Sequence, residues 1–135
     1  MKIDHIGFVV EDIADASANF CALYGYRKHG DVLLDFDRKV KLLLLYSEND
    51  YCIELIQPLD SKSPAYDFMK KGGGMHHICY GVSDIESAIL QMKSNDHMLI
   101  ERPKPALLFN RRKVAFLYAK FNRQIVELLE SEVER

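Results

Sequence analysis

Two stretches of the chain decide the fold: DHIGFVVEDIADA at residues 4–16 and HHICYGVSDIESA at residues 76–88. The second repeats the pattern of the first, with the equivalent residues pairing as His5 with His77, Ile6 with Ile78, Asp12 with Asp84 and Ala16 with Ala88. Each copy therefore begins with a histidine near its start and continues through the same order of apolar and acidic residues.

Two later blocks keep the same order. Arg38–Val40 aligns with Arg112–Val114, and the run IELI at residues 53–56 aligns with VELL at residues 126–129. Because three blocks stay nearly in register, we expect two copies of one module, at about 3–58 and 75–130. The stretch 59–74 would connect them, and residues 1–135 would form a single domain.

The composition indicates an ordinary globular protein. Hydrophobic residues make up 48% of the chain, enough for a substantial core. The net charge of −2 gives no reason to expect nucleic acid or a membrane surface as a partner. No apolar run approaches the roughly 20 residues of a spanning helix. Three cysteines, an odd number without C-x-x-C spacing, favour reduced thiols and a cytoplasmic location.

The periodicity of each copy predicts the order β-α-β-β-β. After the histidine-bearing strand, Asp12 and Asp84 stand where helix caps belong. Apolar runs then predict strands at 31–36, 40–46 and 51–57, and at 98–101, 113–119 and 124–130. In the connector, Ser63-Pro64 suggests a helix start and the glycines 72–74 its end. We therefore predict an α+β fold whose paired βαβββ modules form a curved mixed sheet around a cleft.

Four residues recur at equivalent places in the modules and suit a metal site. Strand alternation puts His5 on the face shared with Gly7, and His77 on the equivalent face of its strand. Glu54 and Glu127 each lie inside an apolar run, where a carboxylate needs a partner. Two imidazoles and two carboxylates favour one divalent ion, nickel, cobalt, zinc or manganese, over magnesium or calcium, which prefer oxygen ligands.

These residues and their spacing resemble the vicinal oxygen chelate (glyoxalase-like) superfamily, and methylmalonyl-CoA epimerases within it. The likeness runs from DHIGFVV at residue 4 to IVELLE at residue 130, and IELIQPLDSKSPAYDFMKKGGGMHHICYGVSDIESAI is its most specific part. The superfamily's ligand pattern of His, Glu, His and Glu matches His5, Glu54, His77 and Glu127. The resemblance therefore implies a glyoxalase-like fold with a metal cleft between paired modules. It also suggests a homodimer.

The resemblance implies a divalent-metal-dependent isomerase that epimerises methylmalonyl-CoA or a related acyl-CoA thioester by α-proton abstraction through an enolate. Glu127 is the candidate base, and Glu54 is its pseudo-symmetric counterpart. Two alternatives share the fold: a glyoxalase I (lactoylglutathione lyase) that isomerises a thiol adduct of a 2-oxoaldehyde, and a non-enzymatic protein that binds small molecules. The complete ligand set argues against the second alternative, and the stretch KKGGGMHHI favours the epimerase over the glyoxalase.

Other residues concern the walls of the cleft. Arg111, Arg112 and Lys70 are candidates for holding the phosphates of the CoA nucleotide. Some epimerases carry an additional acidic base on the strand after the first helix, where this chain has Lys41. The segment PALLFNRRK at residues 105–113 replaces a glycine-rich loop with an HG pair. The last six residues, ESEVER, are expected to form a solvated tail.

Overall fold

The computed structural model describes residues 1–131, and they divide into two compact units. One unit contains His5–His76, and the other contains Met1–Asp4 together with the chain from His77 onward. Strand β1 (Lys2–Val9) and strand β5 (Gly74–Val82) each pass from one unit to the other. All but the first two residues of the expected ESEVER tail lie outside the described residues.

The unit His5–His76 contains the first βαβββ module. Its strands lie in the order β2-β3-β4-β1, where β2 is Arg27–Asp35, β3 is Val40–Tyr46 and β4 is Cys52–Pro58. Strand β1 runs parallel to β4, and the other neighbouring strands are antiparallel. Parallel pairing of the first and last strands requires a crossover, which helix α1 (Ile13–Tyr24) and the β2–β3 hairpin supply.

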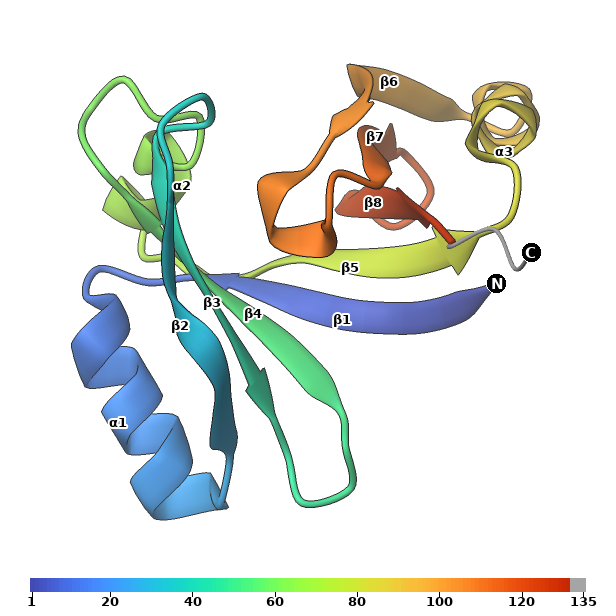
Figure 1. Ribbon diagram of the computed structural model, residues 1–135. Helices are drawn as coiled ribbons and strands as arrows, with labels where there is room; N and C mark the ends of the chain where they lie inside the picture. The colour runs from blue at the N-terminus through green and yellow to red at the C-terminus, as the bar shows by residue number, and fades with distance from the viewer. Residues whose placement is uncertain (132–135) are drawn as a thin grey trace. The chain divides into compact units, whose positions relative to one another are not determined.

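Helix α1 begins where the sequence predicts. The carboxylate of Asp12 accepts hydrogen bonds from the backbone N–H groups of Ala14 and Asp15, which satisfies two of the donors exposed at a helix start. The helix ends at Gly25, whose φ of 73° suits glycine. Figure 1 shows α1 lying along the sheet of this module. The core between them is aliphatic and contains Ile13, Leu43, Leu45, Ile53 and Leu55.

The other unit contains the second module in the same arrangement. Its strands lie in the order β5-β8-β7-β6, where β6 is His97–Pro105, β7 is Lys113–Ala119 and β8 is Gln124–Glu130. Strand β5 is parallel to β8, and the remaining neighbours are antiparallel. Helix α3 (Ile85–Lys93), capped by Asp84, packs its Ile85, Ala88 and Ile89 onto Leu117 and Leu128. The β6–β7 connection contains a short 3-10 helix, η1 (Leu107–Phe109).

The connector forms helix α2 (Tyr66–Lys70), which starts two residues later than Ser63-Pro64 suggested. Ser63 instead closes a turn: its hydroxyl accepts from the N–H of Ala65, and its carbonyl accepts from the N–H of Tyr66. Gly72, Gly73 and Gly74 all have positive φ and end the helix as predicted. A side chain at Gly73 would bring a Cβ to 2.7 Å from the carbonyl oxygen of Val9.

The structure confirms the α+β class and the paired βαβββ modules. The predicted strand ranges differ from the observed ones mainly in the first strand of each hairpin. Strand β2 begins at Arg27, and β6 continues to Pro105, and both contain register shifts. Bulged strands lose the alternation on which sequence prediction relies. Within residues 1–131, none of the helices has the length and apolar character needed to cross a membrane.

Candidate metal centre

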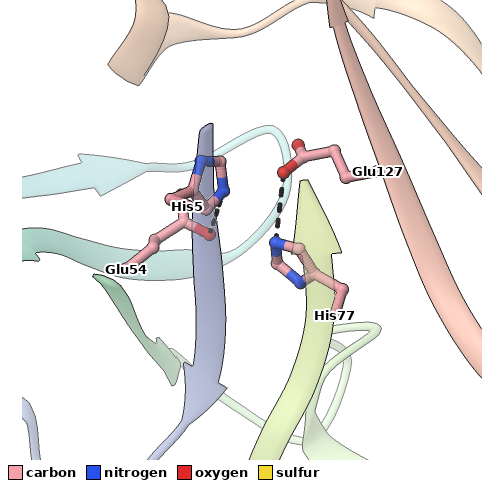
Figure 2. A group of neighbouring side chains, drawn as sticks. All are labelled: His5, Glu54, His77 and Glu127. Carbon is pink, nitrogen blue, oxygen red and sulfur yellow. Dashed lines mark ion pairs between the residues drawn. The ribbon is translucent and has the colours of Figure 1, made fainter. Parts of the chain in front are cut away.

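The first half-site is a histidine and a glutamate on neighbouring parallel strands. Glu54 of β4 is in register with Gly7 of β1, and His5 lies two residues before Gly7, so both side chains occupy one face of the sheet. Nε2 of His5 lies 3.8 Å from Oε1 of Glu54 (Figure 2). His5 is 0% exposed and Glu54 is 5% exposed. The sheet face opposite α1 therefore carries a buried pair of possible metal ligands.

The second half-site repeats this construction in the other module. Glu127 of β8 is in register with Cys79 of β5, two residues after His77. Nε2 of His77 lies 3.1 Å from Oε1 of Glu127, the second dashed contact in Figure 2. His77 is 1% exposed and Glu127 is 3% exposed. Each module thus carries one buried His–Glu pair at equivalent strand positions.

The chemistry of both pairs fits a divalent cation. A carboxylate taken out of water is costly unless a cation or strong donors compensate its charge. Each carboxylate here has one imidazole beside it, and imidazole nitrogen and carboxylate oxygen are common ligands of zinc, nickel, cobalt and manganese. Each pair therefore supplies one nitrogen and one oxygen donor of the required types.

The strands on the other side of each glutamate provide different neighbours. Leu44 of β3 lies directly opposite Glu54, whereas Phe116 of β7 lies directly opposite Glu127. The ring of Phe116 also stands perpendicular to the imidazole of His77, with 5.5 Å between the ring centroids. The pattern of apolar residues placed Phe116 in a strand without revealing this contact, which depends on strand pairing across the module.

The remaining predicted site residues lie on loops and helix ends. Arg111 is exposed, with a φ of 62°, in the turn before β7. Arg112 is half-buried and donates to the carbonyl oxygens of Phe109 and Glu130, so part of its guanidinium stabilises this turn. Lys70 is exposed in the last turn of α2. The ring of His76, the residue before His77, stands edge-on to the ring of Phe68.

Lys41 lies on the helix-facing side of the first module. Lys41 pairs with Gln57 of β4, whereas Leu44 pairs with Glu54. Because side chains alternate between the two faces of a strand, Lys41 lies on the face opposite to that of Leu42 and Leu44. Its side chain therefore shares the face of Leu43, which packs beneath α1. Asp35 of β2 pairs with Val40 and so lies on the same face of the sheet as Glu54. Its carboxylate accepts from the N–H of Arg38 and is 7% exposed, which indicates a turn-forming role.

Comparison with known families agrees with this geometry. A model described as the Glyoxalase/Bleomycin resistance protein/Dioxygenase superfamily matches residues 4–116. The chain belongs to this superfamily. An ethylmalonyl-CoA/methylmalonyl-CoA epimerase of Cereibacter sphaeroides is 32% identical over 94% of this chain and 96% of its own length. A mitochondrial methylmalonyl-CoA epimerase of Dictyostelium discoideum is 40% identical over 96% of this chain and 78% of its own length.

Solved structures give the same fold. A hypothetical protein of Bacillus halodurans superimposes with a TM-score of 0.86 at 31% identity, covering 99% of this chain and 96% of that protein. The paired-module architecture is therefore shared over almost the full length of both proteins.

Proposed function

We propose that the protein is a divalent-metal-dependent epimerase of methylmalonyl-CoA or a closely related acyl-CoA thioester. The observation that carries this proposal is the pair of equivalent, buried His–Glu half-sites in a chain similar to named methylmalonyl-CoA epimerases. The superfamily accounts for the half-sites, and the relatives supply the substrate class.

In this proposal both half-sites bind one ion, with His5, Glu54, His77 and Glu127 as its protein ligands. The ion is nickel, cobalt, zinc or manganese, since two nitrogen and two oxygen donors suit these metals better than magnesium or calcium. One shared ion requires the two units to act together as a single domain of residues 1–135. It also explains why the same two residue types recur in both modules.

The bound ion would supply a Lewis acid that stabilises the negative charge developing on the substrate carbonyl oxygen as the α-proton leaves. The burial of both histidines and both glutamates keeps bulk water away from the reacting carbon. Leu44 and Phe116, on the strands beside the glutamates, would line the face on which the acyl group lies.

Glu127 is the candidate base, and Glu54 is the candidate acid on the other module. Epimerisation needs a proton to leave one face of the α-carbon and a proton to arrive at the opposite face. Two carboxylates contributed by two pseudo-symmetric modules suit that requirement, because each can serve one face. Lys41, on the helix-facing side of its strand, takes no part in this scheme.

The CoA nucleotide carries phosphates that need cations, and Arg111, Arg112 and Lys70 are the proposed contacts. Arg111 and Lys70 are exposed, whereas Arg112 donates to two backbone carbonyls. We therefore expect Arg111 and Lys70 to contribute more than Arg112 to binding of the thioester. A cytoplasmic homodimer completes the proposal, in keeping with three cysteines of unpaired spacing and with the family resemblance.

The glyoxalase reaction shares the first step, because it also removes a proton next to a carbonyl. The two reactions differ in the carbon to which the proton returns. The His–Glu pairs serve either reaction, and the named relatives favour the epimerase.

The test is proton NMR in deuterated water. Protein stripped with a chelator and reloaded with cobalt or nickel is mixed with methylmalonyl-CoA, and the α-proton signal is followed. We expect rapid loss of the signal with the reloaded protein and loss only at the uncatalysed rate with the stripped protein. No exchange by protein that demonstrably holds the metal would exclude the epimerase, and the methylglyoxal hemithioacetal would be tested next.

A further inference from the structure

Two register shifts in β6 decide which face its charged residues occupy. This strand is the last in the order β5-β8-β7-β6 and lies beside β7 (Figure 1). Leu99 pairs with Leu117, which belongs to the core beneath α3. Glu101, two residues later, pairs with Phe116, the immediate neighbour of Leu117. The extra residue, as in a β-bulge, therefore turns Glu101 to the sheet face that carries Phe116 and Glu127.

The second shift turns Lys104 to the same face. Lys104 pairs with Val114 of β7. Val114 pairs in turn with Leu129 of β8, two residues after Glu127. With neighbouring strands about 4.8 Å apart and residues about 3.4 Å apart along a strand, the Cα atoms of Lys104 and Glu127 lie roughly 12 Å from one another. Lysine and glutamate side chains on one face at this separation are able to contact the same small molecule.

Neighbouring residues hold the Lys104 side chain in this place. Its Nζ lies 2.9 Å from Oε1 of Glu101, and the two side chains are 39% and 31% exposed. Pro103 and Pro105 flank Lys104, and a residue before a proline is restricted to extended backbone conformations. The ammonium group is therefore oriented and still accessible to a ligand from solvent.

The ion pair alone gives little reason for this arrangement. A partly exposed pair contributes little to stability, because water screens both charges. β-Bulges, by contrast, are frequent beside active sites, where they re-aim a side chain. Glu127, the candidate base, lies on the face to which these bulges turn Glu101 and Lys104. The geometry therefore favours a ligand-binding role for Lys104.

We propose that Lys104 binds the free carboxylate of the malonyl-type acyl group and that Glu101 positions its ammonium group. The inference rests on the proposed function, which brings an acyl-CoA thioester to Glu127. The ammonium of lysine is a compact charge, suited to a single carboxylate. Arg111, in the turn before β7, remains the proposed contact of the nucleotide phosphates. The two cations thus meet opposite ends of the thioester, and Lys104 selects acyl groups that carry a carboxylate.

The test measures the dissociation constants of malonyl-CoA and acetyl-CoA, two thioesters that differ only in the free carboxylate. Isothermal titration calorimetry is done with the cobalt-loaded wild type, Lys104→Met and Lys93→Met. Lys93 is the matched control, because it is exposed in the last turn of α3, on the other face of the sheet. Both variants remove one positive charge and retain an unbranched side chain.

We expect Lys104→Met to bind malonyl-CoA about 10- to 100-fold more weakly than the wild type, because the carboxylate loses a charged donor. Lys104→Met should bind acetyl-CoA with nearly the wild-type affinity, and Lys93→Met should bind both thioesters as the wild type does. Equal weakening of both thioesters by Lys104→Met would overturn the inference, since Lys104 would then act on the part common to both or on the fold. Wild-type affinity of Lys104→Met for malonyl-CoA would overturn it as well.

The same titrations separate this inference from the proposed function. A wild type that binds both thioesters, with no loss of malonyl-CoA affinity in Lys104→Met, removes the inference and leaves the proposed function standing. A cobalt-loaded wild type that binds neither thioester excludes the acyl-CoA function and this inference with it.

Discussion

The two halves of this chain carry the same candidate metal ligands in different surroundings. His5–Glu54 and His77–Glu127 occupy equivalent strand positions, yet the neighbours of the glutamates are Gly7 and Leu44 in one module and Cys79 and Phe116 in the other. Repetition of the module explains why the donors match. The changed neighbours mean that the two equivalent glutamates are flanked by different side chains.

The largest effect is expected from removing a carboxylate. Glu127→Gln should lower kcat about 100- to 10,000-fold at saturating metal, because it removes both a ligand charge and the candidate base. Epimerisation measured from a single methylmalonyl-CoA epimer is the readout. The matched control is Glu11→Gln, because Glu11 is an exposed glutamate between β1 and α1. This variant should turn over methylmalonyl-CoA at the wild-type rate. Wild-type turnover by Glu127→Gln would show that Glu127 is not the base.

A second comparison concerns the cores of the two modules. Leu55 and Leu128 are equivalent residues, each next to a candidate ligand glutamate and each 0% exposed. Replacing either by alanine should lower the free energy of unfolding by about 2–5 kcal/mol, because each change leaves a cavity in a closed core. Urea unfolding followed by circular dichroism should show one transition for both variants, as a single domain requires. A separate transition for the mutated module would mean that the modules fold independently.

The smallest expected effect compares the helix caps. Asp12 accepts from two backbone N–H groups at the start of α1, whereas Asp84 accepts from that of Ser87 at the start of α3. Each aspartate-to-alanine change should cost about 1 kcal/mol of stability, with Asp12→Ala costing more than Asp84→Ala. Asp12→Asn, which keeps an acceptor oxygen, should stay close to the wild type. The reverse order of the two alanine variants would contradict the cap geometry.

Much of the fold could be predicted because the repeat gave each element two independent occurrences. The caps at Asp12 and Asp84 and the final strands of both modules lie where the sequence indicated. The bounds of the hairpin strands were harder to predict, because β2 and β6 contain register shifts that break the alternation of apolar and polar residues. The start of α2 was also misplaced, since Ser63 closes a turn and leaves the helix to begin at Tyr66.

At the candidate site, alternation was enough to predict that His5 and His77 lie on equivalent faces of their strands, and the apolar runs singled out Glu54 and Glu127. Alternation could not identify the contact between Phe116 and His77, because that contact depends on which residues lie side by side on different strands. Pairing between strands is set by turn geometry and by the packing of whole faces, which a pattern within one strand does not contain.

The central claim is that the two half-sites share one ion, and a cobalt titration tests it most directly. Apo-protein is titrated with Co²⁺ while absorption and heat are recorded, for the wild type, His5→Ala and His77→Ala. We predict one ion per chain, with at least tenfold weaker binding in both variants, because each removes a ligand of the same ion. Two ions per chain, or wild-type affinity in either variant, would contradict the claim.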